Sequence, residues 1–307
     1  MQNETAFRRL MRRVYAYRHI YLLMLPALVY IIIFNYGPMY GAQIAFKNYR
    51  VSKGIWGSSW VGFKNFIRFF NYLDFWKIMK NTAGLSLYGI LAGFPTPVIL
   101  ALLLNEVENA KFKKTVQLIT YAPHFLSVVV GCALILIFFN QTNGIINNII
   151  EVFGGTRTAF LTDPKWFKSL YVLTGVWKNT GWNAIIYLAA LSGISQECVE
   201  AARVDGASRF QIMIHVNLPH IVPTMLILLI LSTGNILSVG FEKVFLLQND
   251  LNFDASTIIS TYTYRVGLMG GEFSYSTAIG LFNSAVNVLV LMIVNTISDR
   301  LTKTSLM

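Results

Sequence analysis

The residues that could do the most specific chemistry lie close together within one long apolar run of the sequence. Lys178 and Trp182 are four residues apart there, and Asn179 and Asn183 repeat the same spacing. Residues at this spacing share one sector of a helix. An aromatic ring can stack on a sugar ring, and amides can hydrogen-bond its hydroxyl groups. The four side chains therefore predict part of a path for an oligosaccharide.

Lys178 places a positive charge in this sector. It lies about ten residues into the run, roughly 15 Å deep at a helical rise of about 1.5 Å per residue. A charge at that depth costs about 2.5–3.5 kcal/mol on insertion scales, so it should face water or a partner. We expect Lys178 to face the path and to attract an anionic sugar, such as a uronate-containing oligosaccharide. Snorkelling to the interface and pairing with a backbone carbonyl are the alternatives.

Three more asparagines in apolar runs are candidates for the same path. They are Asn235 near the end of the fifth run, and Asn283 and Asn287 in the sixth. Small polar residues on membrane helices can also hold neighbouring helices together. For Asn283 and Asn287 this structural alternative stays open.

These residues belong to a chain with the composition of an integral membrane protein. Of its 307 residues, 55% are hydrophobic and only 13% are charged. A spanning helix needs roughly 20 mostly apolar residues. We expect an all-α, polytopic fold with six transmembrane helices, at about 20–36, 82–104, 116–139, 168–191, 222–240 and 276–298. These runs are too long and too evenly apolar for the strands of a membrane barrel.

The chain lacks the common signatures of an enzyme or a metal protein. It has no phosphate-binding P-loop, no HExxH motif and no Gly-x-Ser-x-Gly motif. All 14 acidic residues lie outside the apolar cores, and the two cysteines, Cys132 and Cys198, are far apart in the expected topology. We therefore expect no enzymatic activity, no metal site and no disulfide. A stand-alone secondary sugar carrier and a membrane transferase are the alternatives, but both usually need acidic groups in or near the membrane.

A polar segment between the fourth and fifth apolar runs is the most informative part of the chain. It contains Glu200, Ala201, Ala202, Asp205, Gly206 and Ala207. We expect a short surface helix over 200–209 that Gly206 ends or kinks, because glycine accepts a positive φ. Pro219 and Pro223 are expected to redirect the chain into the next span.

This segment resembles the signature of the permease subunits of binding-protein-dependent ABC importers. The signature reads Glu-Ala-Ala, two residues, Asp-Gly-Ala and a later Leu-Pro, as in residues 200–207 and Leu218-Pro219. The stretches 60–66, 75–76 and 81–82 are similar to the maltose-type oligosaccharide permeases, and 38–41 and 302–307 are similar to one partner of a paired permease heterodimer. The resemblance implies that residues 200–207 form a coupling helix, which docks on a separate ATPase subunit. It also implies a second, similar permease, two ATPase subunits that bind ATP and magnesium, and an extracytoplasmic sugar-binding protein.

The resemblance and the charge pattern together predict the organisation. We expect a basic cytoplasmic segment at 1–19, a permease domain at 20–298 with the coupling loop at 195–219, and a cytoplasmic tail at 299–307. Arg8, Arg9, Arg12, Arg13 and Arg18 precede the first run and favour a cytoplasmic N-terminus in a bacterial cytoplasmic membrane. An acidic oligosaccharide, such as an alginate or pectin fragment, is the substrate hypothesis.

Overall fold

The structure, a computed structural model, describes residues 15–302. The arginines at 8, 9, 12 and 13 and the residues after 302 lie outside this range. Within it the regular secondary structure is almost all helical, as predicted. The exception is a two-stranded antiparallel sheet of β1 (Lys47–Asn48) and β2 (Ser59–Trp60), where Lys47 pairs with Trp60.

Four helices of the described range are long and apolar enough to cross a membrane. The first, Arg18–Phe46, begins with α2 (Arg18–Ile31) and continues through α3 (Gly37–Met39). The second, Phe75–Asn105, consists of α6 (Phe75–Gly93) and α7 (Pro95–Asn105). The other two are Arg209–Thr233 and α18 (Phe273–Thr302). The fourth expected span is α11 (Pro164–Leu191), whose 28 residues are also long enough. Its lysines and amides make it more polar than the others.

The prediction of one continuous third span over 116–139 is wrong. The chain there forms α8 (Ala110–Tyr121), a short 3₁₀ turn (Ala122–Phe125) and α9 (Val128–Phe138), and the two parts are bent by 102°. Pro123 lies in the turn, and Ser127 has extended backbone and caps α9 by accepting a hydrogen bond from the Val130 N–H. A helix-breaking proline followed by a good N-cap residue explains the break.

The polar segment before the fifth span also differs from expectation. Its helix is α12 (Gln196–Val204), so the expected bounds of 200–209 are wrong, although Gly206 does end it with a φ of +78°. The next helix starts at Arg209 and continues through Pro219 and Pro223, the two prolines expected to redirect the chain. α13 (Arg209–Ile212), a π turn (Met213–Asn217) and α14 (Leu218–Thr233) form one helix of 25 residues. Pro219 is tolerated because it lies in the first turn of α14, directly after the wider π turn.

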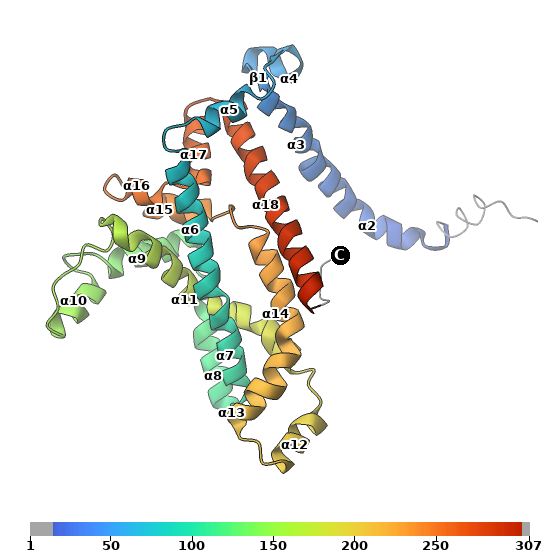
Figure 1. The fold of residues 1–307 in the computed structure, drawn as a ribbon, viewed down its shortest axis with the longest axis vertical. Coiled ribbons are helices and arrows are strands. Elements are labelled where there is room, and N and C mark those ends of the chain that lie inside the picture. Colours follow the sequence, from blue (N-terminus) through green and yellow to red (C-terminus); the bar gives the residue numbers. More distant parts are fainter. Residues whose placement is uncertain (1–14, 303–307) are drawn as a thin grey trace, which may run out of the picture.

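The expected fifth span, 222–240, therefore ends early, at Thr233. Three short helices follow before the last span: α15 (Phe241–Leu247), α16 (Phe253–Ser256) and α17 (Ile259–Tyr264). In Figure 1 they lie at the end of the molecule far from α12, together with α4 (Gly54–Gly57) and α5 (Lys64–Phe70).

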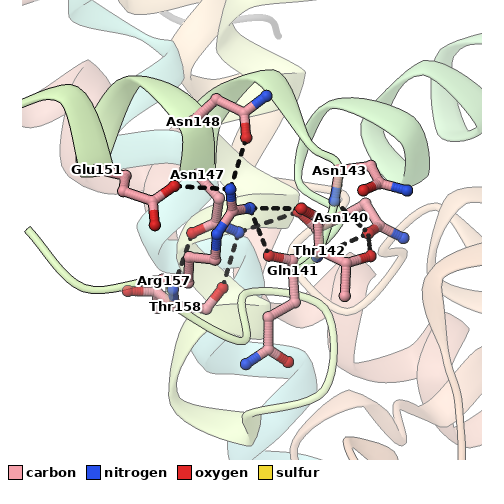
Figure 2. Close-up of polar contacts among 9 residues, drawn as sticks. All are labelled: Asn140, Gln141, Thr142, Asn143, Asn147, Asn148, Glu151, Arg157 and Thr158. Carbon is pink, nitrogen blue, oxygen red and sulfur yellow. Dashed lines mark hydrogen bonds and ion pairs between the residues drawn. The ribbon is translucent and has the colours of Figure 1, made fainter.

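A compact lobe between α9 and α11 contains α10 (Ile145–Val152). Figure 2 shows the Arg157 guanidinium at its centre, donating to the carbonyls of Gln141 and Thr142 and to the side chains of Asn148 and Glu151. The fully buried Asn147 amide links the backbone of Asn140 to that of Thr158. These bonds fix a loop that has little apolar core of its own.

At the start of α11, Asp163 caps the helix, and a hydrogen bond from Lys165 lowers the pKa of its carboxyl.

The helices pack through three separate apolar clusters rather than one continuous core. One cluster joins α6, α9, α11 and α15, a second joins α5, α6, α17 and α18, and a third joins α7, α11 and α14. No residue of α2 is buried, and Figure 1 shows this helix extending away from the rest of the bundle. The first and third clusters hold the walls of the cavity described next.

Candidate functional site

A cavity of about 930 Å³ lies between the membrane-spanning helices. Its wall is formed by residues of α6, α7, α9, α11, α14 and α15, and of the segment between α14 and α15. This volume is within the range of small-molecule sites, roughly 300–1,000 Å³.

The sector predicted on the fourth span lines this cavity. Lys178, Asn179, Trp182 and Asn183 all contribute to the wall from α11, and Asn235 contributes from the segment after α14. The structure thus brings five of the seven path candidates together. The Lys178 ammonium has no hydrogen-bond or ion-pair partner within residues 15–302, so its charge is available to a solute.

His124 supports this sector and was missed by the sequence analysis. Its ring stacks on the Trp182 ring with centroids 4.5 Å apart and an angle of 3°, and its Nδ1 lies 3.2 Å from the Asn179 Oδ1. One face of the indole is therefore covered by protein. A solute ring would have to use the remaining exposed part of Trp182, which is 43% exposed.

Lys243 on α15 is the second residue that the sequence analysis missed. Its ammonium donates to the Tyr171 carbonyl at 2.6 Å and to the Thr174 hydroxyl at 2.9 Å, and lies 4.6 Å from the centre of the Tyr171 ring. It lines the cavity together with Lys178. The described lining residues include these two lysines and no Asp or Glu, so the cavity wall is cationic. The available signal was a lysine just after the fifth apolar run.

The two candidates on α18 do not line the cavity. The Asn287 Oδ1 accepts a hydrogen bond from the Leu237 N–H, and its amide donates to the Ser238 hydroxyl. Asn287 therefore ties α18 to the chain after α14, which is the structural alternative. The Asn283 Oδ1 is buried and has no partner within the described range.

The segment predicted to couple the permease to an ATPase, residues 200–207 (the coupling segment), has a well-defined local geometry. The Gly206 N–H donates to the Arg203 carbonyl and the Ala207 N–H to the Ala202 carbonyl, both at 3.0 Å. This is the Schellman pattern, which needs a left-handed residue such as Gly206. Ser208 and Gln211 then form a capping box that starts α13. Glu200, Ala201 and Asp205 are exposed, while Ala202 and Ala207 are half-buried.

Comparison with known proteins places this geometry in a family. Residues 93–304 match the family described as "Binding-protein-dependent transport system inner membrane component". The chain belongs to this family. The matched range contains the coupling segment, most of the cavity wall and the broken third span.

Individual members of this permease family are similar to the chain over most of its length. The chain is 44% identical to the Bacillus subtilis protein LplB over 281 residues, which is 92% of this chain and 88% of that protein. It is 43% identical to the Bacillus subtilis polygalacturonan/rhamnogalacturonan transport system permease protein YteP, over 95% of this chain and 91% of YteP. The fold also matches a chain of the bacterial alginate ABC transporter crystallised with a periplasmic protein bound to an alginate pentasaccharide. That match has a TM-score of 0.89 and 39% identity, and covers 97% of this chain and 100% of the other.

Proposed function

We propose that this permease forms half of the translocation pathway of an ATP-driven importer for acidic oligosaccharides. A second, similar permease supplies the other half. An extracytoplasmic binding protein delivers the sugar, and two ATPase subunits bind ATP and magnesium. In this proposal the chain itself catalyses no reaction, and its N-terminus, C-terminus and α12 lie on the cytoplasmic side.

The cationic cavity is the observation that supports acidic oligosaccharides as the substrate class. Lys178 and Lys243 both line it, and no carboxylate is among its described lining residues. Two ammonium groups facing one cavity repel each other, and an anionic solute relieves this repulsion. Trp182, Asn179 and Asn183 add a ring face and amides, which suit the rings and hydroxyl groups of a sugar. Polygalacturonan and alginate, named for two of the similar proteins, are both acidic polysaccharides.

The link between ATP and the cavity is the exposed α12. One continuous helix leads from Arg209, just after this segment, to Thr233, and its Leu228, Leu231 and Ser232 line the cavity. When the ATPase subunits close, they move α12, and the helix carries that movement to the cavity wall. Alternation between outward-facing and inward-facing states follows only if ATP binding favours one state over the other.

Transport by the reconstituted importer tests the substrate class. The complete complex in proteoliposomes would be given oligogalacturonides and alginate oligosaccharides as acidic probes, and maltooligosaccharides as neutral ones. We expect uptake of the acidic probes in preference to the neutral ones. Lys178→Ala should reduce acidic uptake about tenfold, the equivalent of roughly 1.4 kcal/mol for one lost charge-assisted contact.

Lys178→Arg is the matched control, since it keeps the charge and should keep most of the acidic uptake. A double variant that also carries Lys243→Met should lose the preference for acidic probes. Equal uptake of acidic and neutral probes by the wild type would refute the substrate class. So would unchanged acidic uptake in Lys178→Ala.

A further inference from the structure

A buried polar contact joins the coupling region to a second cytoplasmic turn of the permease. The Asn217 amide donates to the Glu106 carboxylate at 3.0 Å, although the two residues are 111 positions apart. Asn217 is only 2% exposed and ends the π turn between α13 and α14. Glu106 follows α7 in the short turn that leads to α8. Figure 1 shows the adjoining ends of α7 and α8 beside α13.

A second, exposed contact joins the same two regions. The Arg209 guanidinium donates to the Glu108 carboxylate at 2.7 Å. Both side chains are well exposed, so this ion pair stabilises the contact only weakly, by about 0–1 kcal/mol. The hydrogen bond between Asn217 and Glu106 is therefore the stronger of the two polar contacts between these regions.

Within residues 15–302 the Asn217 side chain makes one hydrogen bond, the one to Glu106. Its Oδ1 is buried and has no hydrogen-bond partner within residues 15–302. An unpartnered buried carbonyl oxygen is costly, about 1–3 kcal/mol, and such groups call for a specific reason. Asn217 also lies in a π turn, and such turns occur often at functional positions of helices.

The turn that Glu106 belongs to leads through α8 to a contact with the cavity wall. From Glu106 the chain continues through α8 to His124, which stacks on Trp182 and contacts Asn179. α14 lines the cavity directly, through Leu228, Leu231 and Ser232. A movement of the coupling segment can therefore reach the cavity wall along α14, and can reach Trp182 and Asn179 through Asn217, Glu106, α8 and His124.

We propose that Asn217 is a positioning residue that makes the turn between α7 and α8 follow the coupling segment during transport. Without it, α14 would move while α8 and the His124 contacts with Trp182 and Asn179 lagged behind, and ATP would be hydrolysed without full opening of the cavity. This inference rests on the proposed function, because it assumes that α12 receives its movement from an ATPase.

The test is the number of oligosaccharides imported per ATP hydrolysed by the complete importer in proteoliposomes, with oligogalacturonides as the probe. Asn217→Asp replaces the donor amide by a carboxylate that faces Glu106, so the two repel. We expect imports per ATP to fall about fivefold or more, the lower end of a typical coupling between sites. Glu106→Gln keeps an acceptor for the Asn217 amide and should stay close to the wild type.

The reciprocal change separates positioning from simple loss of stability. In the double variant Asn217→Asp with Glu106→Gln, the Gln amide can donate to the Asp carboxylate, so the bond returns with its direction reversed. Imports per ATP should then recover. If Asn217→Asp does not assemble, Glu106→Ala removes the acceptor without a charge clash and should show the same loss.

Two results would overturn the inference. One is a normal number of imports per ATP in Asn217→Asp or Glu106→Ala; the other is a double variant that stays as poor as the single one. The wild type in the same liposomes distinguishes failure of the proposed function from failure of the role of Asn217. If it imports no acidic probe, the proposed function fails; if it imports well and the variants match it, only the role of Asn217 fails.

Discussion

At the scale of single residues, asparagines with similar sequence surroundings have different partners in the fold. Asn235 lines the cavity, whereas Asn287 bonds to the backbone of Leu237 and to Ser238. Both lie in apolar runs, so sequence alone could not separate them. What decides is the rotation of each helix against its neighbours, and that depends on packing across the whole bundle.

Asn287→Ala should destabilise the permease without changing its transport selectivity. The substitution leaves the buried N–H of Leu237 without an acceptor, which costs about 1–3 kcal/mol. We expect a lower melting temperature of the purified complex and an unchanged preference for acidic over neutral probes. Ser284→Ala is the control, because that hydroxyl bonds only to the Gly280 carbonyl of its own helix. A shift in selectivity with no loss of stability would instead assign Asn287 to the path.

The α11 residues of the candidate site share one sector for a simple reason. Lys178, Asn179, Trp182 and Asn183 lie on one helix, where spacing alone places side chains on a shared sector. His124 and Lys243 join them from the 3₁₀ turn after α8 and from α15. Their proximity depends on tertiary packing, so no local pattern could indicate it.

At the scale of elements, the bounds of the helices depend on caps and turns more than on apolar length. The third span breaks because Ser127 caps a new helix after Pro123. The fifth span begins at Arg209 because the π turn accommodates Pro219. Both details come from a few residues, whereas the approximate positions of the long apolar helices follow from hydropathy alone.

Gly206 is the element boundary whose replacement should affect coupling most directly. Its φ of +78° is left-handed, and a Cβ there would meet no atom within 4 Å, so the cost of substitution is conformational. A left-handed conformation costs most residues about 1–2 kcal/mol, and asparagine less. ATP-driven uptake should therefore decrease in the order Gly206, Gly206→Asn, Gly206→Val. Full uptake by the valine variant would show that the turn after α12 need not hold this shape.

Gly181 allows α8 and α11 to approach closely. A Cβ at this position would overlap the Thr120 carbonyl and come within 2.9 Å of the Tyr121 ring. Gly181→Ala should therefore push the end of α8 away from α11 and cost about 1–3 kcal/mol, as overpacking usually does. Thermal unfolding of the complex measures this. Gly89→Ala, where a Cβ has open space, is the matched control and should unfold at the wild-type temperature.

At the scale of the whole molecule, one continuous helix, Arg209–Thr233, leads from the residue just after the coupling segment to the cavity wall. This arrangement suits a machine whose energy comes from another subunit. The central claim is therefore that α12 binds a cytoplasmic ATPase and passes its movement to the cavity. Val204 is suited to report such a contact, since it lies at the end of α12 and is 88% exposed.

Site-directed crosslinking from α12 tests this claim most directly. In a Cys198→Ser background, which removes the exposed native thiol of α12, Ala201→Cys and Val204→Cys would each be combined with single cysteines on the ATPase. Leu73→Cys, 95% exposed at the opposite end of the bundle, is the control for sidedness. We predict crosslinks from α12 that change in yield with the nucleotide state, and labelling of Leu73→Cys alone by an impermeant reagent added outside. Absence of crosslinks in every nucleotide state, or labelling of α12 from outside, would contradict the account.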